Sequence, residues 1–480
     1  MTGATPSEEV PQPGAVPNLH LGRVHRSELA NGAEVMVVPR PTVPRVELRV
    51  SVPAGSAAGD SAAAAELLRM GIPLGTRELD QEQLAERLQD LGGALQVHQD
   101  LDRLTISAAA LSEAESELYQ LVASLVREPD FPRDDLAIEK AKLVEALRSA
   151  RATPHFPAHE ALGELVYGQH PYGRREPTEG EVTRTGRRAL QELHRKTFTP
   201  ALAQITVVGD VDPRATVRRL RSAFSGWEGP RQGWKAPRVR ARTHPEILYL
   251  ERPGSVQTVV VAAASGPTLG EPGHIAFSLA TAVLGGGFSS RMMANLREDK
   301  GYTYSPHARV ESHGRDGLAS ASMEVRTEVT AAALAELRHE LARLATVPVP
   351  EDELAATRSY LEGARLVTLQ TQAGLASGLV QVRGLGLDHR YLERYQTELE
   401  RCSAEDVMAA ARRYLAPTRM TTVLVGDESA LPGLEALAPV RRRRPVMPAH
   451  NRCSSTLVSS LGPPRATRAL TGWRGSGRRC

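Results

Sequence analysis

The chain has few cysteines and no long apolar run, and both absences restrict what it can be. Only three of its 480 residues are cysteines; Cys402 lies in the patterned part of the chain, whereas Cys453 and Cys480 lie near its end. This excludes a disulfide framework and a zinc site built from thiolates. The longest apolar segment, Ile275–Leu284, is far shorter than the roughly 18–20 residues that cross a membrane, so we expect no membrane partner.

Aromatic residues are scarce as well, at 4%, while the 41% hydrophobic and 24% charged fractions are ordinary for a globular protein. At this length we expect two to four domains of about 100–200 residues each. Residues Met1–His25 contain no apolar core of the kind that a signal peptide needs, which favours a cytoplasmic location.

The net charge of +3 conceals an uneven distribution. Ten arginines and no lysine, aspartate or glutamate lie between Arg441 and Cys480, so the remainder of the chain carries −7. Some basic runs bind nucleic acid, but no aromatic-interleaved motif accompanies this one, so we expect no nucleic-acid partner. Its composition predicts a disordered tail over residues 439–480.

Two segments repeat one another at an offset of 217 residues. Thr199–Asp210 matches Ala416–Asp427, and each is a β-branched run closed by Gly-Asp after a helix-like segment, Arg188–Phe198 or Glu405–Leu415. A strand, an Arg-Pro turn and a second strand also recur near the start of each half. The chain is therefore predicted to contain two copies of one unit.

Strands paired through hairpins and helices gathered in blocks predict an α+β fold, with two homologous α/β-sandwich domains and largely antiparallel sheets. We expect domains over residues 29–225 and 246–438, a disordered segment over residues 1–28, and a Pro- and Gly-rich linker over residues 226–245. The expected strands are Glu34–Val38, Val46–Val52, Ile247–Glu251 and Gln257–Ala264, with a hairpin over Ala94–Leu111 and alternating segments at Tyr304–Glu311 and Gly317–Val325. The further expected helices are Gln81–Leu91, Ser112–Arg127, Asp134–Arg151, His274–Leu284, Val329–Ala345 and Glu351–Val367.

A helix-like stretch in the first half, Ser61–Thr76, follows a strand-like segment and a turn and ends in a Gly-Thr pair. This layout resembles the N-terminal domain of the pitrilysin/insulinase family of inverted-zincin peptidases, where a helix carries the zinc-binding H-x-x-E-H shortly before Gly-Thr. Aligned on that pair, the two histidine positions fall on Glu66 and Met70, and the general-base glutamate falls on Arg69.

These replacements argue against zinc chemistry in this half. Zinc needs about four N, O or S ligands, and hydrolysis needs a carboxylate base beside the metal-bound water. Methionine is a poor zinc ligand, and arginine neither binds a cation nor accepts a proton at neutral pH. The family's further glutamate ligand falls on Ala146; a slip of one residue would restore Glu145 but no histidine. The resemblance therefore implies no metal or other cofactor in this chain.

The second half carries a longer motif between Leu284 and Ser305, which begins with three consecutive glycines. Glycines allow a tight helix-to-helix turn and close backbone approach, and Ser289 or Ser290 is expected to cap the short helix that follows. A glycine-rich loop before a helix also suggests phosphate binding, but no strand precedes this loop and the Walker lysine spacing is absent.

The same motif is similar to the family's L-G-G-G-x-S-S-R-L…L-R-E-x-x-G-x-x-Y, and the resemblance covers about residues 29–427. In the family, an arginine and a tyrosine seven residues later face the zinc site; here they are Arg297 and Tyr304. A guanidinium and a phenol can hydrogen-bond substrate carbonyl oxygens and stabilise oxyanion charge. The alternative is that Arg297 pairs with Glu298 or Asp299 and Tyr304 packs under a strand.

Two further segments contain residue types that could belong to a site. His155 and His159 are four residues apart, but Pro157 between them permits a regular helix only if it lies in the first turn. Two histidines also fall short of the three convergent ligands that a zinc site needs. Gly92–Val97 falls where active members of the family carry a substrate-pairing edge strand, although Gln96 and Val97 depart from the family's asparagine and alanine.

Some bacterial members of the family divide the site between two chains, and this chain resembles the one that carries the arginine–tyrosine pair. The resemblance implies two halves arranged as a clamshell, a zinc-bearing homologous subunit as partner, and a peptide substrate bound by Arg297 and Tyr304. A scaffold that takes part in no hydrolysis is the second interpretation. An autonomous zinc peptidase with unconventional ligands such as Glu66, Glu145 and His155 is the third.

Overall fold

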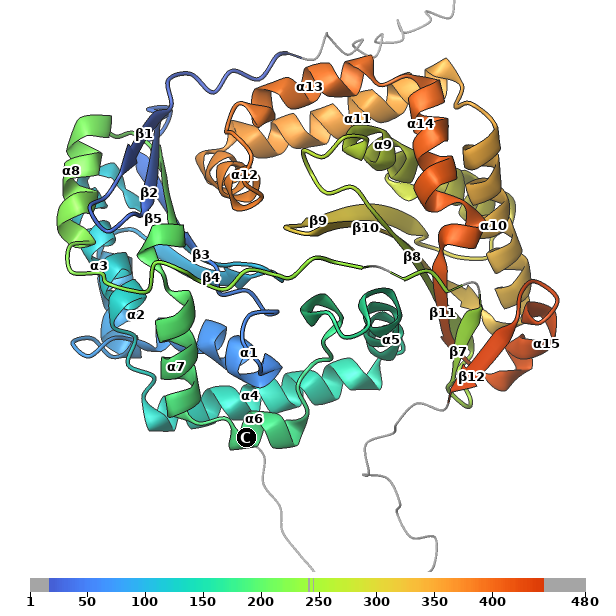
Figure 1. The fold of residues 1–480 in the computed structure, drawn as a ribbon, viewed down its shortest axis with the longest axis horizontal. Coiled ribbons are helices and arrows are strands. Elements are labelled where there is room, and N and C mark those ends of the chain that lie inside the picture. Colours follow the sequence, from blue (N-terminus) through green and yellow to red (C-terminus); the bar gives the residue numbers. More distant parts are fainter. Residues whose placement is uncertain (1–16, 241, 245, 444–480) are drawn as a thin grey trace, which may run out of the picture. The chain divides into compact units, whose positions relative to one another are not determined.

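The computed structural model describes residues 17–240, 242–244 and 246–443, which form two six-stranded sheets flanked by helices (Figure 1). The first half contains β1 His25–Glu28, β2 Glu34–Pro39, β3 Arg45–Val52, α1 Ala62–Gly71, α2 Gln81–Asp90, β4 Ala94–Gln99, β5 Leu104–Leu111, α3 Glu115–Arg127, α4 Arg133–Ala152, α5 His155–Tyr167, α6 Glu179–Arg184, α7 Arg187–Thr197, β6 Gln204–Gly209 and α8 Pro213–Ala223. The second half contains β7 Ile247–Glu251, β8 Gln257–Gly266, α9 His274–Gly285, the π-helix Met293–Asp299, β9 His307–His313, β10 Asp316–Arg326, α10 Thr330–Thr346, α11 Glu351–Gln370, α12 Gln372–Gly384, α13 Tyr391–Arg401, α14 Ala404–Ala410, β11 Thr421–Gly426, α15 Leu431–Leu434 and β12 Val440–Arg443.

The two sheets share one topology. Their strand orders are β1-β2-β6-β3-β5-β4 and β12-β7-β11-β8-β10-β9, so five strands of each sheet correspond in chain order and in pairing. Every pairing is antiparallel except β2 with β6, β7 with β11 and β7 with β12. The predicted α+β fold, with two copies of one unit and largely antiparallel sheets, is confirmed.

The glycine of each repeated Gly-Asp lies closer to the neighbouring strand than a side chain allows. Gly209 closes β6, and a Cβ there would lie 2.3 Å from the carbonyl oxygen of Arg45 on β3. Gly426 closes β11, and a Cβ there would lie 2.6 Å from Oγ1 of Thr258 on the corresponding strand β8. Both distances are shorter than van der Waals contact, so a side chain at Gly209 would require the backbone of β3 to shift, and one at Gly426 would require at least the Thr258 side chain to move.

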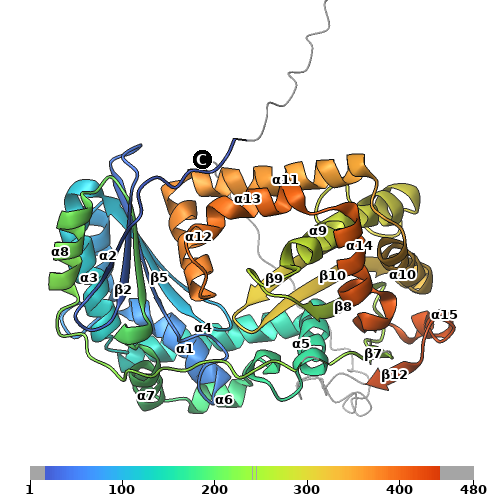
Figure 2. The same cartoon turned by 45° about the horizontal axis from the view of Figure 1, so that its top comes forward.

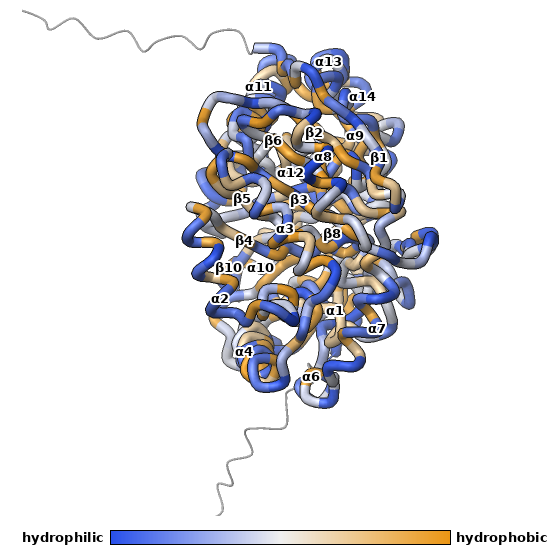
Figure 3. The backbone as a smooth tube through the Cα atoms, turned by 90° about the vertical axis from the view of Figure 1, so that its left-hand side faces the viewer, coloured by the Kyte–Doolittle hydropathy of each residue, from blue (hydrophilic) through white to orange (hydrophobic). Residues whose placement is uncertain are grey.

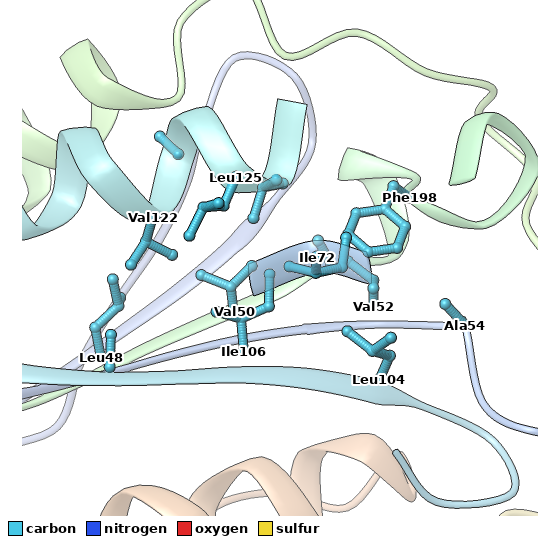
Figure 4. Close-up of a cluster of buried hydrophobic side chains, with 14 of the residues drawn as sticks. Leu48, Val50, Val52, Ala54, Ile72, Leu104, Ile106, Val122, Leu125 and Phe198 are labelled. Atoms are coloured by element: carbon cyan, nitrogen blue, oxygen red, sulfur yellow. The ribbon is translucent and has the colours of Figure 1, made fainter. Parts of the chain in front are cut away.

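Each sheet buries one face against helices of its own half. In the first half, Leu48 and Val50 of β3 and Ile106 of β5 pack against Val122 and Leu125 of α3 (Figure 4). Hydrophobic residues follow the strands, whereas the outer helices α2 and α7 are largely hydrophilic (Figure 3). Within the described residues, no helix is both long and apolar enough to cross a membrane.

The other face of each sheet is covered by a helix from the opposite half of the chain. Helix α5 of the first half lies on β8 and β11, and α12 of the second half lies on β3 and β6 (Figure 2). Leu162 and Val166 of α5 thus share a buried cluster with Val261 of β8, and Leu379 of α12 shares one with Val208 of β6. The two copies are therefore joined by a reciprocal exchange of helices.

Both ends of the folded part extend beyond the predicted domain boundaries. The segment predicted to be disordered up to residue 28 contains β1, and Leu21 is buried with its backbone N–H donating to Glu393 of α13 at 2.9 Å. The tail predicted to be disordered from residue 439 begins with β12, which pairs in parallel with β7. An edge strand needs only backbone partners, so the run Val440–Arg443 joins the sheet despite its three arginines. Residues 1–16 and 444–480 lie outside the described residues.

The predicted linker has no helix or strand within its described residues, but it is held to the fold at several points. Trp227 is buried in the core of the first half. The backbone N–H of Arg242 donates to Val166 at 2.9 Å, and the Arg315 guanidinium donates to the carbonyl of Ala236 at 3.2 Å. The connection between the halves is thus an extended segment packed against the fold.

Candidate functional site

Helix α1 holds the positions where the family resemblance placed two histidines and a general base. Ser61 starts the helix, because its hydroxyl accepts the backbone N–H of Ala64 at 3.2 Å. Glu66 and Met70 are one helical turn apart and so lie on one face. Arg69 donates through Nε to Oε1 of Glu66 at 3.1 Å, and both side chains are about one-third exposed, at 32% and 27%.

The side chains on α1 do not fit a zinc ion. The only carboxylate at these positions, Glu66, is already neutralised by the guanidinium of Arg69, and Met70 packs partly buried against the core. A cation approaching Glu66 would meet a fixed positive charge and a thioether in place of imidazoles and a base.

Helix α4 supplies no replacement ligand. Ala146 is exposed on it, and the adjacent Glu145 has a 69% exposed side chain that pairs with Arg148 at 2.5 Å. Arg148 also donates to Glu179 of α6 at 2.6 Å, so this carboxylate belongs to a surface ion-pair network. A one-residue slip in the alignment therefore does not produce a metal ligand here.

The histidine pair of α5 lies on a regular helix, because Pro157 falls within its first turn. The rings of His155 and His159 stack with centroids 6.4 Å apart, and Nε2 of His155 contacts Glu324 of β10. Burial, followed by the charge of His155, lowers the pKa of His159.

The three unconventional ligands are engaged with three different partners: Glu66 with Arg69, Glu145 with Arg148, and His155 with Glu324. Among residues 17–240, 242–244 and 246–443, no group of three or more His, Cys, Asp or Glu side chains is arranged to hold a metal ion.

The three glycines of the second half permit close packing at the end of α9. A Cβ on Gly285 would lie 2.4 Å from the backbone nitrogen of Ala308 in β9, and one on Gly286 would lie 2.7 Å from Cα of Ala282. The expected close approach is thus explained by packing alone.

The expected serine cap is wrong: the π-helix has no side-chain cap, and the buried hydroxyl of Ser290 has no hydrogen-bond partner in the described part of the chain.

The π-helix region is held in place by contacts with residues that are distant in the sequence. Arg291, with a 6% exposed side chain, makes a two-pronged ion pair to Glu353 of α11, with Nε and Nη2 each 2.8 Å from a carboxylate oxygen. Asn295 donates to Glu340 at 2.9 Å and to Glu336 at 3.1 Å, both on α10. The partners are more than 40 residues away in sequence, so no local pattern marks them.

The structure brings Arg297 and Tyr304 together. The guanidinium carbon of Arg297 lies 4.7 Å from the centroid of the Tyr304 ring and 5.7 Å from that of Phe288. Tyr304 is 78% exposed, so it does not pack under a strand. The alternative for Arg297 holds in part, since its Nε also lies 3.3 Å from Glu298. Phe288, at a variable position of the motif, is a neighbour of Arg297 that sequence reasoning missed.

The segment that resembles a substrate-pairing strand is an edge strand. β4 ends the order of the first sheet, and its residues alternate between exposed and half-buried. The turn before it needs glycine at two positions: Gly92 has a φ of 57°, and a Cβ on Gly93 would lie 2.6 Å from the carbonyl oxygen of Ala109.

The fold, the altered α1 positions and the motif of the second half together define the class of protein. The family model "Insulinase (Peptidase family M16)" matches residues 34–175, and "Peptidase M16 inactive domain" matches residues 186–361. The chain therefore belongs to the pitrilysin/insulinase peptidase family, as the motifs predicted.

Relatives at the level of individual proteins are distant but cover most of the chain. An uncharacterized zinc protease of Mycobacterium tuberculosis is 25% identical over 85% of this chain and 94% of its own length, and one of Streptomyces coelicolor is 21% identical over 82% and 88%. A crystal structure of a peptidase M16 inactive domain from Pseudomonas fluorescens has a TM-score of 0.79 at 23% identity, covering 84% of this chain and 98% of that one. A protease from Helicobacter pylori has a TM-score of 0.78 at 17% identity, covering 84% and 99%.

Proposed function

We propose that this protein is the non-catalytic subunit of a two-chain zinc peptidase, in which Arg297 and Tyr304 bind the peptide substrate and a homologous partner supplies zinc, water and general base. Two of its relatives are called zinc proteases, and a protein of the same fold is called a peptidase M16 inactive domain.

The observation that carries the proposal is the contact between Arg297 and Tyr304. A cation 4.7 Å from the centroid of an exposed phenol ring is held in place by the ring while its remaining N–H groups stay available. Those donors suit the carbonyl oxygens of an extended peptide. The ion pair of Arg69 with Glu66 supports the same division of labour, since it leaves hydrolysis to another chain.

We expect the purified chain to retain no stoichiometric zinc. The donor set on α1 contains one carboxylate, which is already paired with a guanidinium. Elemental analysis after dialysis against zinc-free buffer would measure this, with a homologue that carries H-x-x-E-H as the positive control. One tightly held zinc ion per chain would contradict the proposal and favour the autonomous enzyme.

We expect Arg297→Ala to reduce the peptidase activity of the mixture with a zinc-bearing homologue by about tenfold or more, since hydrogen bonds to a charged donor contribute about 1.5–3 kcal/mol. The activity of the parent and variant mixtures on a fluorogenic peptide would be compared at equal subunit concentrations. Arg188→Ala is the matched control, because that arginine is 91% exposed on α7. Full activity of the Arg297→Ala mixture would remove Arg297 from the mechanism, and pairing without any hydrolysis would favour the scaffold.

A further inference from the structure

The motif of the second half leaves a large apolar side chain in solvent beside the proposed peptide-binding arginine. Phe288 is 84% exposed, the highest value among the exposed large hydrophobic residues of the described chain. Its ring centroid lies 5.7 Å from the guanidinium carbon of Arg297, and Tyr304 occupies a second position around the same guanidinium at 4.7 Å. Exposed aromatic residues grouped in this way are typical of interaction sites.

The turn that carries Phe288 packs closely against the fold. A Cβ on the preceding Gly287 would lie 3.3 Å from the ring of Tyr360, so the turn lies directly on that ring. Gly286 is packed against Ala282 in the turn before. Phe288 follows directly on this packed turn, and its ring is left in solvent.

The helix that carries Arg297 is anchored to the rest of the fold. Asn295, on the same π-helix, is tied to two glutamates of α10, and Arg291 immediately before that helix is tied to Glu353. π-helical segments are rare and are frequent at functional sites. The Arg297 guanidinium and the Phe288 ring thus present a polar and an apolar contact side by side.

We propose that Phe288 forms an apolar subsite that selects peptides with an aromatic or aliphatic side chain next to the carbonyl group that Arg297 binds. This inference rests on the proposed peptide-binding role of Arg297. The geometry fits an extended peptide, in which a backbone carbonyl and an adjacent side chain lie only a few ångströms apart. An apolar side chain placed on Phe288 would remove both surfaces from water, whereas a polar one would gain little.

The test uses the full-length chain and two fluorescein-labelled decapeptides of equal charge, one alternating alanine with phenylalanine and the other alternating alanine with serine, each flanked by lysines. Fluorescence anisotropy gives the Kd of each peptide. We expect the parent to prefer the phenylalanine peptide, and Phe288→Ala to weaken that peptide's binding by about tenfold, the scale of discrimination by one apolar contact. Binding of the serine peptide is expected to stay unchanged.

Two further variants make the result specific. Phe288→Leu keeps an apolar side chain and is expected to retain most of the preference. Ile138→Ala removes a side chain that is 54% exposed on α4 and is expected to change neither Kd. Thermal unfolding of each variant checks folding, which removal of an 84% exposed side chain should leave intact.

The inference is overturned if Phe288→Ala weakens both peptides by the same factor or weakens neither. It is also overturned if the variant lowers the affinity for the zinc-bearing homologue while peptide binding is unchanged, because Phe288 would then belong to the subunit interface. Arg297→Ala separates the two proposals: it should weaken both peptides equally. Should it bind like the parent while Phe288→Ala loses the preference, the role of Arg297 fails and the apolar subsite stands.

Discussion

Neither half of the chain is expected to fold when produced without the other. The exchange of α5 and α12 means that each sheet obtains the cover of one face from the opposite half. A fragment of residues 17–240 would expose Met36, Val38 and Val208, which are at most 2% exposed in the whole chain. A fragment of residues 246–443 would expose Val259 and Val261 of β8 in the same way.

The loss of stability in each fragment can be estimated from the apolar side chains that the other half covers. Burying one such side chain contributes about 1.5–3 kcal/mol, and each exchanged cluster contains several from each half. For one half, the sum over a cluster is of the same order as the roughly 5–15 kcal/mol by which a whole domain is stable. Loss of the partner half therefore removes a stabilisation as large as the whole free energy of unfolding expected of the remaining half.

Expression of the two fragments separately and together would measure this. Separate fragments should be insoluble or should lack a cooperative unfolding transition in circular dichroism, and co-expression should restore one complex by size-exclusion chromatography. In the intact chain, Leu379→Ala should lower the unfolding free energy by about 2–5 kcal/mol, the usual cost of such a cavity. Two fragments that each melt cooperatively as monomers would show that the exchange is dispensable.

The repeat and the strands could be predicted from sequence because their causes are local. β-branched runs mark the inner strands, and the paired Gly-Asp marks the same close approach in both copies. The exchange could not be predicted, since α12 buries Leu375, Leu379 and Val382 and nothing in their spacing says which sheet they face. The strand β12 could not be predicted for a related reason. Its pairing depends on backbone groups, whereas its three arginines are typical of a solvated tail.

In the candidate site, too, contacts between residues close in sequence could be predicted, whereas contacts between distant residues could not. Arg297 and Tyr304 are seven residues apart in one recognisable motif, so their contact involves residues that are close in sequence. The ion pair of Glu66 with Arg69 has the i,i+3 spacing that helices favour. By contrast, Glu353 is 62 residues from the arginine that it holds, and only the folded chain brings the two together.

Asp316→Asn is expected to stabilise the protein at pH 8 and to have little effect at pH 4. Asp316 is 5% exposed at the start of β10, and it accepts hydrogen bonds from Tyr167 of α5 at 3.0 Å and from Ser265. Burial raises the pKa of this carboxyl from 3.8 to about 6, against the effect of those two hydrogen bonds. The folded state therefore binds the proton more tightly than the unfolded state does.

Because the pKa of Asp316 is higher in the folded state than in the unfolded state, the free energy of unfolding falls as pH rises. Below about pH 4 the carboxyl is protonated in both states, and as pH rises through about 6 the folded chain must carry a buried charge, so stability is lost. The shift corresponds to about 3 kcal/mol at pH 8. An asparagine is neutral at every pH and retains an oxygen that can accept from Tyr167, so the variant avoids this cost.

Urea unfolding of parent and variant at pH 4 and pH 8 would measure the difference. Asp427→Asn is the control of opposite sign, because hydrogen bonds from Ser429 and then from the backbone of Gly254 lower the pKa of that carboxyl. Its replacement should cost stability at pH 8 and cost less as pH falls toward the range where the carboxyl is protonated. An equal effect of Asp316→Asn at both pH values would show that the carboxyl is not destabilised by burial. A stabilising effect at pH 8 alone would instead show that the contact between Tyr167 of α5 and Asp316 of β10, where the two halves meet, contributes more to stability in mild acid than at pH 8.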